Sequence, residues 1–355
     1  MDELISKRKE LDEIDKEILS LLNKRMEIAS HIIQCKKERK QKVTDEKREA
    51  QIFERLEGIA KHPILKENIE NIYHSIIDTA KAIGVFESGH SLPFKKIGII
   101  GMGLMGGSLA KALKAKSEEI KIATYRCNAS DNKLAREHNV IDEEYAHLED
   151  LIKNSELLII ATPISSVIPL AREIHMISKK TKQPTLLIDI SSVKSSISAE
   201  FEKLSDEFLE CIPTHPMAGS EKSGFIHSQA KLFIHRPWII TSHKKNKEKN
   251  IQSIKEFISY IGAHPLCMKA DIHDRRAALV SHFPSFLAFS FLRFLLKIDP
   301  EAKEMCGPGF ASFTRIAHQN PTLRSEIMQN NSEEIQKLLT LWMEEIPSYK
   351  SEAVK

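Results

Sequence analysis

A run of glycines near residue 100 has the residue types and spacing of a phosphate-binding turn. Gly101, Gly103 and Gly106 follow a short apolar stretch and precede a helical pattern at residues 108–114. Gly101 allows a tight turn, Gly103 lets a pyrophosphate approach the backbone at the helix N-terminus, and Gly106 allows close helix–strand contact. We therefore expect a bound dinucleotide, in preference to a glycine-rich turn that binds nothing. The other residues expected to line this cofactor site are Met102, Leu104, Met105, Thr162, Pro163 and Ser191.

The residue after the second apolar strand bears on which dinucleotide binds. That strand, residues 120–124, is followed by Tyr125 and Arg126, where an NAD site usually carries an acid bonded to the ribose 2′-hydroxyl. Arg126 offers a guanidinium fork for a 2′-phosphate instead. We predict a preference for NADP, with NAD as a second acceptor. The alternative is that Arg126 merely faces solvent.

Four polar segments, far apart in the sequence, could supply chemistry for a substrate. They are residues 189–194, 214–224, 281–284 and 313–317. The first two follow apolar strands, at the carboxyl edge where parallel sheets place their ligands. Taken singly, His215 could equally be a core histidine and Arg315 a surface residue.

Three cations lie on or beside the apolar stripe of the first predicted helix. Arg8, Arg25 and Lys36 each stand four residues after an apolar residue of that stripe, where a pure coiled coil would carry Leu or Ile. One interpretation is that their stems pack on the helix while the charged ends reach water. Together with Arg48 in the next helix they could instead surround a buried dianion, because Arg binds carboxylates through paired hydrogen bonds.

The first 88 residues are expected to form helices that lack a core of their own. Apolar spacing predicts one helix from residue 3 to about 40, which is roughly 55 Å long and too long for a compact monomer. Thr44 is a plausible N-cap for a second helix, and a third ends near Phe86. Helices of such unequal length cannot bury their stripes alone, so we expect packing against a partner chain.

Beyond residue 88 the hydrophobic period changes. Short apolar runs separated by helical segments predict βαβ units in a parallel sheet, and the pattern is again all-helical after about residue 270. The runs are residues 96–100, 120–124, 157–161 and 186–190. The predicted fold is multidomain, with an all-α domain at 1–88, a linker at 89–94, an α/β Rossmann domain at 95–270 and an all-α domain at 271–355.

Composition argues against several classes of partner. The 355 residues carry a net charge of only +3, so we expect no nucleic acid partner. The five cysteines form no CxxC pair, so we expect neither a disulfide framework nor a metal site. Residues 277–298 are apolar but include Arg293, which would cost roughly 2.5 kcal/mol or more near mid-bilayer. We interpret this stretch as an interface helix and expect a cytoplasmic protein with no membrane partner.

From Arg8 to Glu49 the sequence resembles the all-helical chorismate mutases, which are intertwined dimers, with matching spacing and no gap. The resemblance implies that cations hold the carboxylates of chorismate while Lys36 donates to the breaking ether oxygen. A Claisen rearrangement needs only a held conformer and a stabilised ether oxygen, which fixed cations supply. By resemblance the remaining binding residues are Arg8 (reaching the other subunit's site), Arg25 and Arg48 for the carboxylates, and Asp45 and Glu49 near the ring hydroxyl.

The third helix departs from that family. Where it usually carries Ser and, four residues on, Gln or Glu, this chain has Ala80 and Gly84. Losing one preorganised donor commonly costs ~10²–10³ in rate, unless Glu87 substitutes through a shift in register. The alternative is that the helices form a non-catalytic dimerisation or regulatory module.

The segments DISSVK, THPMAGSEKSG, VSHFP and FTRIA, in this order, resemble the prephenate/arogenate dehydrogenases over essentially all of residues 95–345. The resemblance implies a Rossmann domain followed by a helical domain that forms a homodimer. It implies that His215 takes the proton of the substrate C4 hydroxyl and that Ser192 orients both groups. Arg315 would hold a substrate carboxylate, and the pocket would be lined by His282, Ser220 and Glu221.

Together the two resemblances imply tyrosine biosynthesis, with chorismate rearranged to prephenate and prephenate oxidatively decarboxylated to 4-hydroxyphenylpyruvate. Ser285 stands where many relatives have a second histidine, which leaves open whether prephenate or arogenate is the substrate. The runner-up is an NADP-dependent arogenate dehydrogenase with a weakly active or non-catalytic mutase-like module. A β-hydroxyacid dehydrogenase and a cofactor-binding regulator without catalysis are less favoured. We expect no regulatory domain after Lys355.

Overall fold

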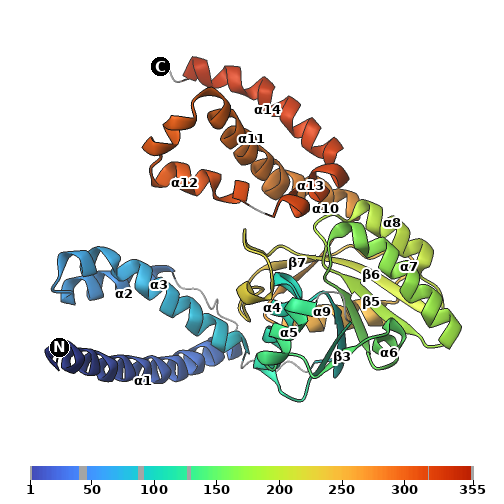
Figure 1. The fold of residues 1–355 in the computed structure, drawn as a ribbon, viewed down its shortest axis with the longest axis horizontal. Helices are drawn as coiled ribbons and strands as arrows, with labels where there is room; N and C mark the ends of the chain where they lie inside the picture. The colour runs from blue at the N-terminus through green and yellow to red at the C-terminus, as the bar shows by residue number, and fades with distance from the viewer. Residues whose placement is uncertain (1, 40–45, 87–91, 126–128, 319, 353–355) are drawn as a thin grey trace. The chain divides into compact units, whose positions relative to one another are not determined.

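Residues 1–90 and 91–355 form two separate units of the chain. The structure is a computed structural model and describes residues 2–39, 46–86, 92–125, 129–318 and 320–352. Figure 1 shows helices alone in the first unit, and a sheet with helices in the second.

Three helices make up the first unit. α3 packs against both of the others. Pro63 begins α3, where the missing N–H of proline costs no helical hydrogen bond. The predicted N-cap of α2 at Thr44 lies outside the described residues. The helices are α1 (Asp2–Glu38), α2 (Glu46–Ile59) and α3 (Pro63–Phe86).

Small residues allow α3 to approach α1 closely. Ala80 is buried, and a Cβ added to Gly84 would lie 2.6 Å from Ile33 Cδ1, closer than two carbons can approach. Gly84 therefore belongs to the contact between the helices, and the buried Ala80 lies one turn earlier on the same face of α3. This packing gives a structural reason for the two residues at which the sequence departs from the chorismate mutases.

Apart from this contact, the apolar stripe of α1 is left uncovered by the described residues of the first unit. Leu21, at its middle, is 67% exposed. Such a long exposed stripe agrees with the expectation that the three helices cannot bury their apolar residues alone. Its other exposed members include Leu4, Leu11, Ile14, Ile18 and Ile28.

The second unit is built on one eight-stranded sheet in the order β3-β2-β1-β4-β5-β6-β7-β8. The first six strands pair in parallel, and β7 runs antiparallel to β6. The order reverses between β1 and β4, so the ligand crevice of such a sheet lies at their carboxyl ends. The strands are β1 (Lys96–Ile100), β2 (Lys121–Tyr125), β3 (Glu143–Tyr145), β4 (Leu157–Ile160), β5 (Thr185–Asp189), β6 (Leu209–Pro216), β7 (Pro237–Ile240) and β8 (His264–Cys267).

Helices connect the successive strands and bury the faces of the sheet. On α7, Val167, Ala171 and Ile174 recur at helical spacing and pack in one buried cluster with Leu158 and Leu187. The predicted Rossmann fold is therefore confirmed. Its helices are α4 (Leu104–Lys116), α5 (Ala129–Glu137), α6 (Leu148–Lys153), α7 (Ile164–Thr181), α8 (Ser195–Leu204) and α9 (Glu248–Tyr260), with a 3₁₀ turn η1 (Phe225–His227).

The remainder of the second unit is all-helical, as predicted, and α11 is its central element. A π-helical turn, η2 (Ala278–His282), joins α10 to α11. The wider turn suits Pro284, which has no N–H and whose ring clashes with the carbonyl four residues earlier in a regular helix. The other elements are α10 (Ala270–Ala277), α11 (Phe283–Ile298), η3 (Pro300–Met305), α12 (Pro308–Thr314), η4 (Arg315–His318), α13 (Pro321–Asn330) and α14 (Ser332–Glu352).

Among the described residues, the continuous helix Ala270–Ile298 is the one long and apolar enough to span a membrane by length and composition alone. Only 22% of its most apolar window is buried inside the single chain. Phe294 and Ile298, at 60% and 66% exposure, belong to the uncovered face. The predicted interface helix therefore presents a face that the described residues of the second unit do not cover.

Candidate active sites

The glycine turn after β1 has the geometry of a phosphate cradle. Gly101 has φ +104°, a conformation that favours glycine, and a Cβ on Gly106 would lie 1.9 Å from the Gly101 carbonyl oxygen. An added Cβ on Gly103 would be no closer than 4.0 Å to any other group, so the backbone there is open to a ligand. α4 begins without a side-chain cap, which leaves its first N–H groups for an anion.

The end of β4 lies beside this turn. Thr162 follows the strand, and its buried Oγ1 has no hydrogen-bond partner among the described residues. An orphaned hydroxyl beside a bare helix terminus is what a polar ligand would satisfy. The residues present therefore fit a dinucleotide.

Not every residue predicted to line the cofactor faces open space. Met102 is completely buried, while Leu104 and Met105 are half-buried at the start of α4. Pro163 is the N-cap residue of α7. Ser191 is buried, and its hydroxyl bonds to Asp189. Arg126 lies outside the described residues.

A buried ion pair organises the carboxyl ends of β5 and β6. Lys194 and Asp189 are completely inaccessible to solvent and bond to each other. Asp189 also accepts the backbone N–H of Thr214 at 3.1 Å. Burial lowers the pKa of Lys194, and the attraction of Asp189 opposes this shift. Since a buried pair is costly to break, the two strand ends are held rigidly.

His215, on β6, is the buried imidazole at this edge, with 7% exposure. Its Nδ1 lies 2.8 Å from Nε2 of His273, and Nδ1 of His273 lies 2.8 Å from Oδ1 of Asp274. Burial, followed by the nearby His273, Lys194 and His282, holds the pKa of His215 well below its usual value. His215 is therefore neutral near pH 7 and able to accept a proton.

His282, at the end of η2, points an unpaired nitrogen into the interior. Its Nδ1 lies 3.0 Å from Nδ2 of Asn331, and its buried Nε2 has no partner among the described residues. Nδ2 of Asn331 also donates to the Asp274 carbonyl at 2.9 Å, so it is the donor end of the amide. Nδ1 of His282 then accepts, and Nε2 carries the hydrogen. Burial lowers the pKa of His282 to about 4, so this neutral N–H donor persists near pH 7.

The segments that carry Arg315 and Glu221 meet. Their side chains form an ion pair at 3.2 Å, with Arg315 61% exposed. Ser220 accepts the N–H of Lys222 at 3.1 Å. Ser192 is half-buried, and within the described part of the chain its hydroxyl makes no hydrogen bond. The side chain that contacts His215 is His273, which was not predicted from the sequence.

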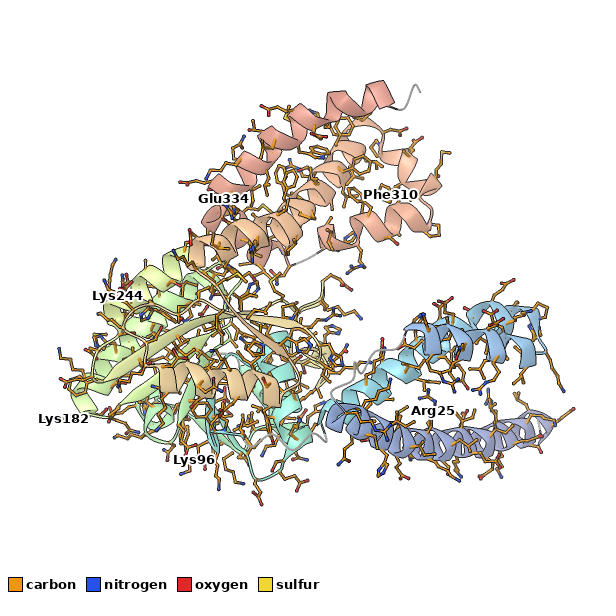
Figure 2. The ribbon with its side chains drawn as sticks, turned by 180° about the vertical axis from the view of Figure 1, so that it is seen from behind. Arg25, Lys96, Lys182, Lys244, Phe310 and Glu334 are labelled. Atoms are coloured by element: carbon orange, nitrogen blue, oxygen red, sulfur yellow. The ribbon has the colours of Figure 1, made fainter. Side chains whose placement is uncertain are left out.

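In the first unit, Arg25 lies beside a cavity of about 340 Å³ on α1. Its Nη1 is buried without a hydrogen-bond partner among the described residues, and Figure 2 labels this side chain on the long helix. Such an orphaned cation is suited to an anionic ligand. The cavity is lined by Leu21, Lys24, Arg25, Ile28, Ala29 and Ile32.

The other predicted mutase residues are only partly brought together. Glu49 pairs at 2.9 Å with Lys81 of α3, a cation that the sequence analysis missed. Arg48 bonds to Gln51 at 3.4 Å. Lys36 is half-buried on α1, and Arg8 is exposed near its start. Asp45 lies outside the described residues.

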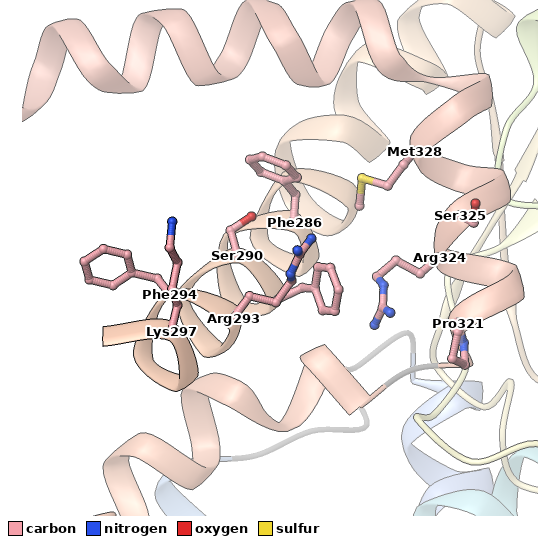
Figure 3. Close-up of a pocket in the computed structure, with 10 residues that line it drawn as sticks. Phe286, Ser290, Arg293, Phe294, Lys297, Pro321, Arg324, Ser325 and Met328 are labelled. Atoms are coloured by element: carbon pink, nitrogen blue, oxygen red, sulfur yellow. The ribbon is translucent and has the colours of Figure 1, made fainter. Parts of the chain in front are cut away.

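A second cavity, of about 760 Å³, lies between α11 and α13 in the helical part of the second unit. Figure 3 shows Arg293 from α11 and Arg324 from α13 directed toward this space. The Arg324 guanidinium stacks 3.7 Å from the centre of the Phe289 ring. Aromatic and cationic side chains that remain this open are typical of a subunit interface.

Three family models match successive parts of the chain. Chorismate mutase type II matches residues 7–84. The nucleotide-binding domain of prephenate dehydrogenase matches residues 109–267, and the dimerization domain of prephenate dehydrogenase matches residues 269–354.

Individual relatives agree with these matches. The chain is 26% identical to the prephenate dehydrogenase of Bacillus subtilis over 251 residues, 70% of this chain and 67% of that protein. It is 27% identical to the cyclohexadienyl dehydrogenase of Zymomonas mobilis over 244 residues, 67% of this chain and 82% of that protein. The structure of prephenate dehydrogenase from A. aeolicus with hydroxyphenyl propionate and NAD+ superposes with a TM-score of 0.67 at 27% identity, covering 74% and 92% of the two chains.

A Rossmann sheet, an open glycine turn at its switch point and a neutral buried histidine at a nearby strand end define a dinucleotide-dependent dehydrogenase. The chain belongs to the prephenate dehydrogenase family and carries a chorismate mutase type II domain ahead of the dehydrogenase. The predicted bifunctional enzyme of tyrosine biosynthesis is thereby confirmed at the level of its domains.

Proposed function

We propose that the chain converts chorismate to prephenate in its first unit and oxidatively decarboxylates prephenate in its second, with NADP as the preferred acceptor. The observation that carries the dehydrogenase assignment is the neutral, buried His215 at the carboxyl edge of the sheet that bears the glycine turn. A reaction that removes a hydroxyl proton needs such a base.

The proposed dehydrogenase step divides the work between a bound cofactor and the side chains. His215 accepts the C4 hydroxyl proton at Nε2, and the O–H electron pair becomes the second bond of a carbonyl. A dinucleotide held at the Gly101–Gly106 turn would supply the acceptor for the hydride that leaves C4. The new carbonyl accepts the electron pair of the C1–carboxylate bond, so CO2 leaves and the ring becomes aromatic.

The remaining side chains are proposed to position the substrate. Arg315 holds a carboxylate, for which its present partner Glu221 would have to give way. The Nε2–H of His282 is a buried donor for a substrate oxygen. Ser192 orients the C4 hydroxyl, and Ser220 and Glu221 line the pocket.

The proposed mutase step is electrostatic. Arg25, with its buried unpaired Nη1, binds a carboxylate of chorismate, and Arg48 and the other subunit's Arg8 complete the cage. Lys36 donates to the ether oxygen, and Asp45 and Glu49 lie near the ring hydroxyl. The exposed stripe of α1 and the dimerization-domain match at residues 269–354 support a homodimer, and we place the protein in the cytoplasm.

The residue types at Ala80 and Gly84 of α3 favour one alternative. Because neither residue carries a polar side chain, the ether oxygen lacks a donor from these positions. The first unit would then act weakly or serve dimerisation only, and arogenate would be the substrate of the second unit.

The test is kcat/KM for prephenate and for arogenate, each with NADP and with NAD, beside chorismate turnover. We expect the highest value for prephenate with NADP, together with measurable mutase activity. Turnover of arogenate alone would support the alternative. An NAD preference would contradict the cofactor assignment made from Arg126.

A further inference from the structure

We infer that His273 and Asp274 form a positioning pair that fixes the His215 ring with a hydrogen on Nδ1 and a free lone pair on Nε2. The inference rests on the proposed role of His215 as proton acceptor and adds two residues that act through it. Both are buried, at 2% and 4% exposure.

The direction of each hydrogen bond in the series His215–His273–Asp274 follows from Asp274, the acceptor at its end. Oδ1 of Asp274 can only accept, and it already accepts the backbone N–H of Lys194 at 2.7 Å. Nδ1 of His273 must therefore donate to it. In a neutral ring Nε2 of His273 then accepts, and the 2.8 Å contact makes Nδ1 of His215 the donor. Nε2 of His215 is left with the lone pair that a hydroxyl proton needs.

The Asp274 carboxylate is itself held firmly as an anion. Burial alone would raise its pKa, but hydrogen bonds from His273 and from the Ser195 and Lys194 backbones outweigh it and lower the pKa. Its Oδ2 accepts the N–H of Ser195 at 2.8 Å, at the first turn of α8 where a negative charge is favoured. The pair is thus anchored between α10 and α8 and cannot rotate without losing these bonds.

The same arrangement helps His215 once it has gained a proton. The groups around the ring are Asp189 at the end of β5, Lys194 just before α8, His282 from η2, and His273 with Asp274 from α10. A positive charge on His273, Lys194 or His282 opposes one on His215. Asp274, reached through His273, favours one, because the protonated ring can share its proton along the 2.8 Å contact.

Asp274→Asn removes the fixed acceptor of this order. The Lys194 and Ser195 N–H groups donate to different oxygens of Asp274, and an amide offers only one oxygen, so in either orientation its NH₂ opposes one of these N–H groups. The amide therefore no longer holds the hydrogen on Nδ1 of His273, and the form of His215 with hydrogen on Nε2 becomes populated. We expect kcat to fall about 10²–10⁴-fold with little change in KM for NADP.

A second variant separates orientation from charge. In His273→Gln the side-chain NH₂ can face Asp274 while its oxygen accepts from His215, so the tautomer survives but the proton cannot be shared. We expect His273→Gln to retain at least ten times the kcat of His273→Ala. Equal activities of these two variants would overturn the inference.

Asp206→Asn is the matched control. Asp206 likewise binds a histidine at 2.8 Å, here Nε2 of His175, and accepts two backbone N–H groups, from Phe208 and Leu209. Asp206 is more exposed than Asp274, so its loss should lower stability less, and it should leave kcat unchanged. A merely structural role for Asp274 would make the two variants alike.

The decisive readout is the tautomer of His215, observed by ¹⁵N–¹H histidine NMR of the full-length protein and assigned by signal loss in His215→Asn. We expect hydrogen on Nδ1 alone in the wild type and a mixture of the Nδ1–H and Nε2–H forms in Asp274→Asn. The same tautomer in both would overturn the inference, whatever the substrate. Absence of wild-type turnover of prephenate and arogenate would overturn the proposed function alone, because the NMR experiment needs no substrate.

Discussion

A single imidazole carries most of the chemistry proposed for the second unit, and its surroundings set the pH range in which it works. Burial, with His273, Lys194 and His282, lowers the pKa of His215, so the neutral form persists as the pH falls. Activity requires that form and is lost only when the pH drops through the lowered pKa. The acidic limb of kcat/KM should therefore lie below about pH 6.5, the ordinary value for histidine. A limb at or above that pH, measured with saturating NADP, would contradict the assignment.

Replacing the base should separate chemistry from binding. His215→Asn keeps the size of the side chain but cannot take the hydroxyl proton, so we expect kcat to fall by about 10³-fold. NADP affinity, measured by titration calorimetry, should stay within a factor of about two. The exposed His264 offers a control, since His264→Asn should leave both quantities unchanged. Undiminished turnover by His215→Asn would remove His215 from the mechanism.

At the scale of elements, the contact between α1 and α3 depends on a missing side chain. Gly84→Ala places a Cβ 2.6 Å from Ile33 Cδ1, so we expect a loss of about 1–3 kcal/mol in the stability of the first unit. Gly58 of α2 has nothing within 4 Å of its added Cβ, so Gly58→Ala should instead gain about 0.5–1 kcal/mol. Urea unfolding followed by helical circular dichroism would measure both. A stabilising Gly84→Ala would show that the helices are not in close contact there.

The elements were largely predictable from the sequence, because helical and strand periods differ and buried parallel strands are continuous apolar runs. The glycine turn was also predictable, because the spacing of its glycines between an apolar run and a helical pattern is visible in the local sequence. His273 and Asp274 were not, because a His-Asp pair at the start of a helix looks like ordinary surface charge until folding brings it to His215. The role of Lys81 was not predictable either, because a lysine on an amphipathic helix has the pattern of a solvent-facing residue until α2 brings Glu49 beside it.

At the scale of the whole molecule, the first unit is expected to need a second copy of itself. Ile18 is 50% exposed at the middle of α1, on the stripe that lacks cover in the single chain. Ile18→Glu should reduce mutase activity at least tenfold, because a charge in a desolvated interface is costly. Dehydrogenase activity should be retained, since the match to a dimerization domain lies at residues 269–354. Ile18→Leu is the control, and equal loss of both activities would show that the units do not assemble independently.

The π-helical turn at Ala278–His282 links the orientation of His282 in the proposed substrate pocket to the stability of the helix. A π turn holds one residue more than a regular turn. The extra residue rotates the side chains of all following helical residues by roughly 100° about the helix axis. Deleting Leu279 would turn the Nε2–H of His282 away from the interior, and would bring the Pro284 ring against the carbonyl four residues earlier in a regular helix. Selection for heat resistance alone should therefore favour this deletion only together with replacement of Pro284, and such variants should bind the substrate poorly.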